Sequence, residues 1–370
     1  SREKTDARER GMGYDLCLDG IFGFQFRPPA DAAVAALLER VNALPVRLRA
    51  AVDLPSGLGD GDLGASSSVF RADFTYATGV VKMPVVDSSH AAVAGRLRYM
   101  DLGFFDDGGL AETGRPRPAT PAGAKSRLSM LTPQGLAPLR ELRAPDSDKR
   151  DYGQVFVLGG SRSFPGALLM SVLAALRSGA GLVTAFAPES LAAAFAARAP
   201  EAMWVGWPET PGGGLALEGA HLLRERIERA TSLLLGPGVG REPETLALVG
   251  ALVKEASVPL VIDADALQPE IVQAGKAPRV LTPHAGEYER SVDAIPDEAT
   301  LVLKGPVTRI GSAAGLSPAL GQAKGGRKTR PFAERIIYHS FFGGPVLARG
   351  GSGDLLCGLV GGLLAQTPAE

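Results

Sequence analysis

The sequence predicts an α/β protein of two domains, in which a parallel sheet covered by helices follows a smaller α/β domain. Its 370 residues exceed the length of one average domain. Short runs rich in Val, Ile and Leu alternate with Ala- and Leu-rich amphipathic runs, a repetition typical of strands and helices that follow each other in turn. Several apolar runs stop at Gly, Pro, Asp or Thr, and such strand ends form the ligand-binding edge of a parallel sheet.

The amino-terminal part of the chain, up to about Ala144, has a pattern of its own. A helical run at residues 30–44 lies between two strand-like runs at 14–24 and 48–57. Residues 114–147 then bring Pro, Gly and charge with little periodicity, a composition typical of linkers. We therefore predict a first domain at 1–113, a linker at 114–147 and a second domain at 148–370.

The second domain begins with the pattern of a buried strand that ends in a glycine turn, "YGQVFVLGG", followed by the helical run "FPGALLMSVLAALRSGAG". Four further strand-like runs each stop at a turn-forming or polar residue: "LVTAFAP", "SLLLGPGVG", "PLVIDADAL" and "RVLTPHAGE". In a parallel sheet the carboxyl ends of the strands gather at one edge. We therefore expect the sheet to be the scaffold and its strand ends to carry the functional site.

The composition excludes several classes of protein. With 39 Lys and Arg against 40 Asp and Glu, the charge is nearly balanced, so we expect no nucleic-acid partner. Cys17 and Cys357 are far apart and have no CxxC or Cys/His cluster beside them, which argues against a disulfide scaffold or a zinc site. The first residues are charged where a signal peptide is apolar, and no apolar run is long enough to span a bilayer. These features predict a soluble cytoplasmic protein that acts on small molecules and has no membrane partner.

The stretch "ARGGSGDLLCGLVGGLLAQ" has the pattern of a glycine-rich turn that leads into a helix. Gly350, Gly351, Ser352 and Gly353 let the backbone approach an anion, while the first N–H groups of the helix and its dipole attract that anion. Asp354 follows in the first turn, where its carboxylate would accept a proton from a substrate hydroxyl that attacks a phosphate. On this stretch alone, an ordinary helix start with an acidic residue is an equal alternative.

Six stretches occur in order along residues 148–366: "YGQVFVLGGSRSFPGALLMSVLAALRSGAGLVTAFAPES", "LLLGPGVG", "VIDADAL", "LTPHAGE", "LVLKGPVT" and "GGPVLARGGSGDLLCG". In order and approximate spacing they resemble the NAD(P)H-hydrate dehydratase family, a branch of the ribokinase-like superfamily. The resemblance implies a ribokinase-like fold for the second domain. It also implies the activity of that family, which uses ADP or ATP to dehydrate the S-epimer of hydrated NADH or NADPH back to NAD(P)H.

The resemblance also implies roles for residues at the expected strand ends. Gly240 and His284 match positions that contact the hydrate. The nucleotide-binding positions match a larger set: Lys304, Gly305, Thr308, Gly350, Gly351, Ser352 and Gly353. Asp354 would take the proton as the ring hydroxyl is phosphorylated, after which phosphate leaves and the dihydropyridine ring is restored. Judged from the residues alone, a structural histidine and a solvated lysine at a strand end remain alternatives.

Asp263 and Asp265 end the strand of "PLVIDADAL". Two interpretations remain open: the two residues form a turn, or they hold Mg²⁺ through water. Together with ADP or ATP, Mg²⁺ is therefore an expected cofactor of the second domain.

The amino-terminal domain resembles the second half of the Rossmann-like NAD(P)H-hydrate epimerase domain. The stretches that carry this resemblance are "DLCLDGIFGF", "AAVDLPSGLGDGDLG" and "VFRADFTYATGVVKMPV". On that basis Asp19 and Ser56 occupy the positions of ligands to K⁺, Gly23 begins the phosphate loop, and Asp53 contacts the substrate.

Two departures from the epimerase pattern affect this domain. The chain contains no Asn-rich "GNNGGDG" type loop, and the "GTG" type turn of the family reads "GFQ" at residues 23–25. Phe24 and Phe26 would crowd a phosphate loop. We therefore expect no epimerase activity from this domain alone, and interpret it as a remnant that packs against the dehydratase.

The second domain departs from its family as well. Residues 321–342 are longer and more basic than the short hairpin usual there, and the "GNPG" type block reads "GGPV". We interpret the added Lys and Arg as a solvated loop, and both chain ends look shortened relative to the family. A kinase for a vitamin alcohol and a non-catalytic nucleotide-binding protein remain as alternative functions. We also expect a homo-oligomer.

Overall fold

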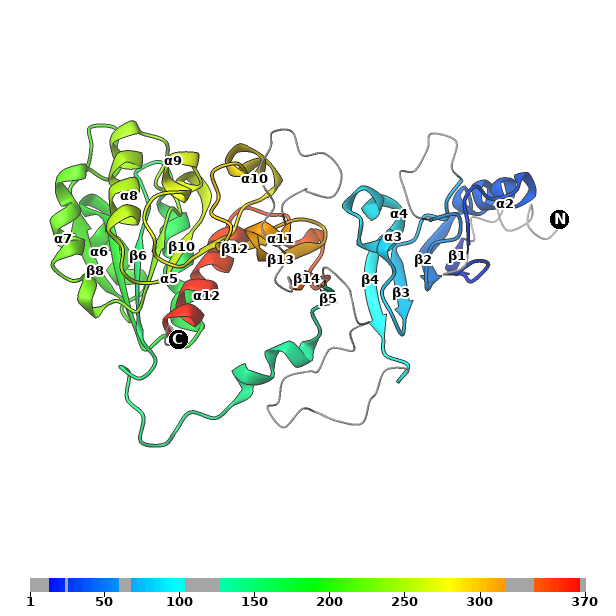
Figure 1. Ribbon diagram of the computed structural model, residues 1–370, viewed down its shortest axis with the longest axis horizontal. Helices are drawn as coiled ribbons and strands as arrows, with labels where there is room; N and C mark the ends of the chain where they lie inside the picture. Colours follow the sequence, from blue (N-terminus) through cyan, green and yellow to red (C-terminus); the bar gives the residue numbers. More distant parts are fainter. Residues whose placement is uncertain (1–12, 24–25, 60–67, 104–126, 317–335, 367–370) are drawn as a thin grey trace. The chain divides into compact units, whose positions relative to one another are not determined.

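The computed structural model describes residues 13–23, 26–59, 68–103, 127–316 and 336–366. The chain forms two compact units, whose elements are labelled in Figure 1. Unit 1 comprises residues 1–124 and 339–344, and unit 2 comprises residues 125–338 and 345–370. The first boundary between the units falls inside the segment that the sequence predicts as a linker.

Unit 1 is built on four parallel strands in the order β1-β2-β3-β4. The strands are β1 (Tyr14–Asp19), β2 (Val46–Val52), β3 (Phe74–Thr78) and β4 (Arg96–Met100). The helical elements are α2 (Ala32–Asn42), α3 (Met83–Val86), η1 (Ser88–His90) and α4 (Ala91–Ala94). The predicted order of strand, helix and strand at the start of the chain is thus confirmed as β1, α2 and β2.

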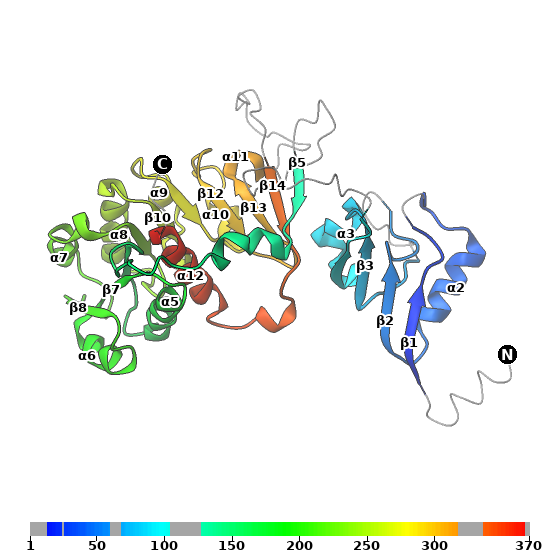
Figure 2. The ribbon, with the colours of Figure 1, turned by 90° about the horizontal axis from the view of Figure 1, so that it is seen from below.

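Helix α2 lies alongside β1 and β2, as Figure 2 shows. It begins after Asp31, whose carboxylate accepts a hydrogen bond of 2.9 Å from the backbone N–H of Val34, as N-cap residues do. Leu38 of α2 packs with Ala51 of β2 and with Phe70 in a small buried core. This helix therefore covers one face of the sheet.

The other face of this sheet carries exposed apolar side chains. Leu16 of β1 is paired with Leu48 of β2, and both side chains are exposed, as are those of Leu18 and Val52 on the same two strands. Parallel sheets are usually buried on both faces. The core of unit 1 is correspondingly small for the length of its strands.

Unit 2 contains a sheet of ten strands in the order β5-β14-β13-β12-β11-β10-β9-β6-β7-β8. The strands are β5 (Arg127–Met130), β6 (Gln154–Leu158), β7 (Leu182–Pro188), β8 (Met203–Trp207), β9 (Ser232–Leu235), β10 (Leu260–Ile262), β11 (Arg279–Leu281), β12 (Thr300–Leu303), β13 (Thr308–Ser312) and β14 (Ile336–Ser340). Strands β6 to β12 pair in parallel, and β13 pairs with β12 in the antiparallel direction. This order confirms the parallel sheet predicted from the apolar runs.

Helices cover both faces of this sheet. They are α5 (Pro165–Arg177), α6 (Glu189–Arg198), α7 (Ala220–Arg224), α8 (Pro243–Glu255), α9 (Pro269–Val272), α10 (Ala285–Ser291), α11 (Ala313–Leu316) and α12 (Ser352–Gln366), with the short 3₁₀ turns η2 (Pro133–Arg140), η3 (Leu217–Gly219), η4 (Ile227–Arg229), η5 (Ala264–Ala266) and η6 (Pro345–Leu347). Helices α5, α8 and α9 each begin with a proline, whose fixed φ suits the first helical position.

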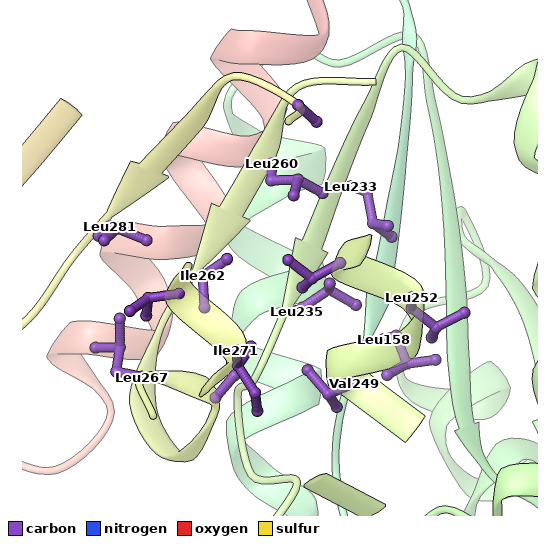
Figure 3. Close-up of a cluster of buried hydrophobic side chains, with 14 of the residues drawn as sticks. Leu158, Leu233, Leu235, Val249, Leu252, Leu260, Ile262, Leu267, Ile271 and Leu281 are labelled. Carbon is purple, nitrogen blue, oxygen red and sulfur yellow. The ribbon is translucent and has the colours of Figure 1, made fainter. Parts of the chain in front are cut away.

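The strands of unit 2 send successive side chains into two different cores. Val155 and Val157 of β6 pack in the core formed with α5 and α12. Phe156 and Leu158 of the same strand pack in the core on the other face, with α8 and α9. Figure 3 shows the second core, where strand side chains such as Ile262 meet those of the covering helices. The strands are therefore buried on both faces, which explains their continuous apolar runs.

The direction in which strands are added reverses at β6. This strand lies between β7 and β9, and the loops that follow β6 and β9 are both rich in glycine. A hydrogen bond of 2.7 Å from Gly160 N to Pro237 O joins the two loops. Ligand sites of open α/β sheets lie at such a reversal point. This edge of the sheet is therefore the place to examine for function.

The segment between residues 114 and 147 is more regular than its composition predicts. Its described part forms β5 at the edge of the ten-stranded sheet and the turn η2. An edge strand of four residues gains its hydrogen bonds from its neighbour β14, so it needs no strong periodicity of its own.

Candidate active site

Two charged side chains meet at the carboxyl ends of β10 and β12. Asp263, which follows β10, is 2% exposed, and Lys304 follows β12. The Nζ of Lys304 donates to Oδ1 of Asp263 at 3.1 Å. Because β11 lies between the two strands, this ion pair reaches across it. Ala264 beside Asp263 has a φ of 54°, which residues with a Cβ rarely adopt, so the backbone here is strained.

Helix α12 begins against this ion pair. A Cβ added at Gly353 would lie 3.3 Å from Nζ of Lys304 and 3.7 Å from Oδ2 of Asp263. The absence of a side chain at Gly353 therefore lets the first turn of the helix approach the pair closely. Asp354 is the next residue, and its side chain is half-buried. The structure thus brings Asp354, Lys304 and Gly353 together.

The environment of Asp354 raises the pKa of its carboxyl group above the usual value. Burial is the largest cause, repulsion by Asp263 adds to it, and attraction by Lys304 lowers the pKa in part. A raised pKa makes the ionised carboxylate a stronger proton acceptor. The chemistry of Asp354 therefore suits a general base.

Below Asp354, helix α12 packs on α5 through small residues. Ser171 Oγ of α5 lies 3.0 Å from the carbonyl oxygen of Asp354, and Cys357 Sγ donates to the same oxygen at 3.2 Å. Cys357 is fully buried, and burial raises the pKa of its thiol well above its usual value, so the thiol is not a candidate nucleophile. Sequence reasoning gave no role to Ser171, because the contact joins residues 183 positions apart.

The glycine-rich turn before α12 leaves backbone accessible. A Cβ added at Gly350 would meet no atom within 4 Å, and Gly351 has a φ of 86°, where a side chain would also collide with Met170. The hydroxyl of Ser352 donates to Arg349 O at 3.1 Å. The predicted approach of this turn to an anion therefore rests on its backbone N–H groups.

His284 begins helix α10 as its N-cap residue. Its Nδ1 accepts hydrogen bonds from the backbone N–H groups of Gly286 and Glu287, at 3.1 and 3.3 Å. Glu287 completes a capping box, since its Oε2 accepts from His284 N at 2.8 Å, and its Oε1 lies 3.3 Å from His284 Nε2. With Nδ1 used as an acceptor, Nε2 carries the proton of the neutral ring. The sequence pointed to His284 but not to Glu287, for which the spacing of "HAGE" was the available signal.

The predicted nucleotide loop joins β12 to β13 beside this histidine. Lys304 N donates to Pro283 O at 2.9 Å, and Lys304 forms an isolated parallel bridge with His284. Gly305 lies in the connecting turn and Thr308 is the first residue of β13. The two predicted subsites are therefore adjacent at one edge of the sheet.

Gly240 lies in the loop that follows β9, at the reversal point of the sheet. Its φ is 76°, and an added Cβ would lie 3.9 Å from Ser161 Oγ, in the loop that follows β6. The neighbouring Arg241 donates from Nε to Asp265 Oδ1 at 2.8 Å. Asp263 and Asp265 are thus each paired with a different cation. No group of three or more His, Cys, Asp or Glu that suits a metal occurs among the described residues, and we assign neither carboxylate to a metal.

The predicted potassium ligands of unit 1 lie together. Oδ1 of Asp19 accepts from Ser56 Oγ and Oδ2 accepts from Ser56 N, both at 2.6 Å, and Asp19 is buried. A third hydrogen bond to Asp19 comes from Ile21 N at 3.3 Å. These donors are neutral, and the buried carboxylate and the hydroxyl supply oxygen atoms, the type of ligand that a hard cation binds.

Asp53 and Gly23 also lie together in unit 1. A Cβ added at Gly23 would lie 3.1 Å from Oδ2 of Asp53, which itself has a φ of 71°. Oδ1 of Asp53 accepts from Thr78 Oγ1 at 2.9 Å and forms an ion pair with Lys82. Lys82 was missed by sequence reasoning, although it follows a strand end within the matched stretch "GVVKMP".

Parts of the sequence-based interpretation lie outside the described residues. They are Phe24, Gln25 and most of the basic segment 321–342. Phe26 is described, and its ring stacks on that of Phe22 with centroids 4.6 Å apart. None of the helices in the described part of the chain combines the length and apolarity that crossing a membrane requires.

Most of the chain matches one known protein family. The family model described as NAD(P)H-hydrate dehydratase matches residues 155–370. The chain belongs to this family. A second model, described as YjeF-related protein N-terminus, matches residues 1–83 of this NAD(P)H-hydrate dehydratase family member. Both resemblances stated from the motifs are therefore confirmed.

Curated relatives extend the match over most of the family member's length. The bifunctional NAD(P)H-hydrate repair enzyme Nnr of Moorella thermoacetica is 34% identical over 95% of this chain and 64% of its own length. The enzyme of the same name from Gloeobacter violaceus is 35% identical over 99% of this chain and 69% of its own length. The ADP-dependent (S)-NAD(P)H-hydrate dehydratase of Listeria monocytogenes is 28% identical over 65% of this chain and 82% of its own. The chain thus spans about two thirds of the repair enzymes that it matches.

A solved structure supports the fold of this family member. The crystal structure of a ribokinase-like superfamily protein from Enterococcus faecalis is 28% identical, with a TM-score of 0.52, and covers 65% of this chain and 81% of its own. The expected ribokinase-like architecture, preceded by a partial Rossmann-like domain with a parallel sheet, is confirmed.

Proposed function

We propose that unit 2 catalyses the ADP- or ATP-dependent dehydration of the S-epimer of hydrated NADH or NADPH. The observation that carries this proposal is the position of Asp354, a half-buried base candidate that ends a glycine-rich turn and stands beside Lys304. Membership of the dehydratase family supports the substrate class. The balanced charge of the chain agrees with a small-molecule substrate, and its two distant cysteines agree with a location in the reducing cytoplasm.

In the proposed reaction, the oxygen of the ring hydroxyl attacks the terminal phosphoryl group of the nucleotide. Asp354 takes the proton of this hydroxyl. The bond from that phosphorus to the bridging oxygen breaks, and the shortened nucleotide leaves. The C–O bond of the new phosphate ester then breaks, inorganic phosphate departs, and loss of a ring proton restores the double bond. Backbone N–H groups of Gly350, Gly351 and Gly353 stabilise negative charge on the transferred group.

The remaining predicted residues bind the two ligands. Gly240 and the Nε2–H of His284 contact the hydrate, while Lys304, Gly305 and Thr308 bind the nucleotide phosphates. Mg²⁺ carried by the nucleotide would neutralise charge on the transferred phosphoryl group. Lys304 supplies further positive charge at that position.

The test is an assay of the full chain with hydrated NADH, Mg²⁺ and either ADP or ATP, followed by the absorbance of the restored dihydropyridine. Asp354→Asn should lower turnover by at least about two orders of magnitude, the size of a general-base contribution, and leave nucleotide affinity nearly unchanged. Wild-type protein without turnover, or a variant with near-normal turnover, would contradict the proposal.

For unit 1 we propose a partial epimerase-type site without epimerase activity. Asp19 and Ser56 would hold K⁺, and Gly23 and Asp53 would border the substrate. The "GTG" type turn of the epimerase family reads "GFQ" at residues 23–25, and the bulk of phenylalanine disfavours a phosphate loop. Supplied only with the R-epimer of the hydrate, where spontaneous epimerisation is slow, the chain should consume it at the background rate. Rapid consumption that depends on protein would show that unit 1 is active.

A further inference from the structure

The ion pair between Asp263 and Lys304 packs against the turn that carries Asp354. Both side chains come from strand ends two positions apart in the sheet, and their contact of 3.1 Å lies beside the backbone of Gly353. Asp263 is 2% exposed, so its charge is shielded from water and acts strongly on its neighbours. We propose that Asp263 and Lys304 are positioning residues for Asp354, with opposite effects on its readiness to accept a proton.

The charged and titratable groups near Asp354 come from three elements. Asp263 after β10 and Lys304 after β12 act on its carboxyl group. The buried thiol of Cys357 within α12 has a raised pKa and is uncharged, as is Ser171, the facing residue of α5. Of these, only Lys304 favours the ionised form of Asp354. Burial raises the pKa of Asp354 most, and one anion and one cation that bind each other then adjust it in opposite directions.

Removing Lys304 and removing the charge of Asp263 should shift the pKa of Asp354 in opposite directions. Without Lys304, the buried charge of Asp263 is no longer neutralised and disfavours ionisation of Asp354. Without the charge of Asp263, Lys304 loses its partner and acts on Asp354 alone, which favours ionisation. If the ion pair were purely structural, the two substitutions would not shift the pKa of Asp354 in opposite directions.

The experiment is a pH titration of the full, ligand-free chain, followed by the ¹³C chemical shift of the Asp354 carboxyl group, which is identified by its loss in Asp354→Asn. Lys304→Met should raise the titration midpoint by about one pH unit, and Asp263→Asn should lower it by about the same amount, the lower end of the effect of a neighbouring charge. The double variant should lie close to wild type. Midpoints that move in the same direction, or do not move, would overturn the proposal.

A neighbouring ion pair supplies the matched control. Arg241 and Asp265 lie at the same edge of the sheet and form an exposed contact of 2.8 Å, and Asp265 follows Asp263 by two residues. Arg241→Met and Asp265→Asn should leave the midpoint of Asp354 in place. If Asp263→Asn does not fold, the test compares the midpoints of Lys304→Arg and Lys304→Met. Arginine keeps the charge, so its midpoint should stay near that of wild type, whereas that of Lys304→Met should rise.

The effect of the ion pair on catalysis rests on the proposed function, whereas its effect on the pKa of Asp354 does not. A second measurement distinguishes failure of the inference from failure of the proposed function. The acidic limb of the pH profile of kcat/KM should move with the titration midpoint in each variant. Wild-type protein that does not convert the hydrate would contradict the proposed function, while the titration would still decide the inference. A titration that shifts as expected without any movement of the acidic limb would overturn the role of the pair in catalysis.

Discussion

At the scale of single residues, the site places a carboxylate where it is costly to ionise. Burial and the charge of Asp263 both raise the pKa of Asp354 in the folded chain, and Lys304 opposes them only in part. A strong base is thereby obtained at the expense of stability. The same feature that suits Asp354 to accept a proton should therefore be visible in the unfolding of the protein.

We expect Asp354→Asn to raise the melting temperature at pH 7 to 8. A carboxyl group whose pKa is raised by folding destabilises the native state as the pH rises through that pKa, and does not do so below the unfolded value, where it is protonated in both states. The difference between variant and wild type should therefore disappear near pH 3 to 4. Thermal melts of both proteins across this pH range provide the measurement, and a variant less stable at neutral pH would contradict the argument.

His284 combines two tasks that substitution can separate. Its Nδ1 caps helix α10, and its Nε2–H is proposed to bind the hydrate. His284→Ala should lower the free energy of unfolding by about 0.5–2 kcal/mol and lower the affinity for the hydrate. His284→Asn should restore the helix cap but still bind the hydrate poorly. Calorimetry with hydrate and with nucleotide, beside urea unfolding, measures both effects. Equal losses of affinity for the two ligands would rule out the proposed division of subsites.

At the scale of elements, the position of Asp354 depends on how closely α12 approaches α5. A Cβ added at Gly358 would collide with the backbone oxygen of Ser171, so only glycine permits this contact. Gly358→Ala should therefore destabilise unit 2 by about 1–3 kcal/mol and displace the first turn of α12.

Gly166→Ala is the matched control for this prediction. Gly166 lies in α5, where an added Cβ would meet nothing within 4 Å, so alanine there should be neutral or stabilise by up to about 1 kcal/mol. Urea midpoints of the two variants give the comparison. A Gly358→Ala protein as stable as Gly166→Ala would mean that the two helices can separate without loss.

The sequence predicted these elements unequally well. Strands such as β6 and β9 were predicted because burial on both faces leaves a continuous apolar run. Asp354 and His284 were proposed as site residues because they lie in recognisable motifs, and their roles stay predictions. Strand β5 was not found, because a short edge strand depends on a distant partner. The contact of Asp263 with Lys304 was not predicted either, since it joins residues 41 positions apart that only the order of strands brings together.

At the scale of the whole molecule, the two units differ in how much core they have. The sheet of unit 1 has one face of exposed apolar side chains, whereas that of unit 2 is covered on both faces. Unit 1 therefore buries less apolar surface for each ordered residue, and its stability should be lower.

We expect unit 1 to unfold at a lower concentration of urea than unit 2. Both tryptophans of the chain, Trp204 and Trp207, lie in β8 of unit 2, so their fluorescence reports on that unit alone. Far-UV circular dichroism reports on both units. The dichroism should begin to change before the fluorescence does, and two coincident transitions would indicate a single cooperative unit instead.

The two free cysteines give each unit its own reporter of slow opening. Cys357 is fully buried under the first turn of α12, and Cys17 is partly buried in β1, and burial raises the pKa of both thiols. An alkylating reagent can therefore modify Cys357 only when α12 separates from α5. The rate of Cys357 alkylation then reports how often the turn that holds Asp354 opens. Mass spectrometry of the two labelled peptides would measure the opening of the turn that holds Asp354 separately from the opening of unit 1.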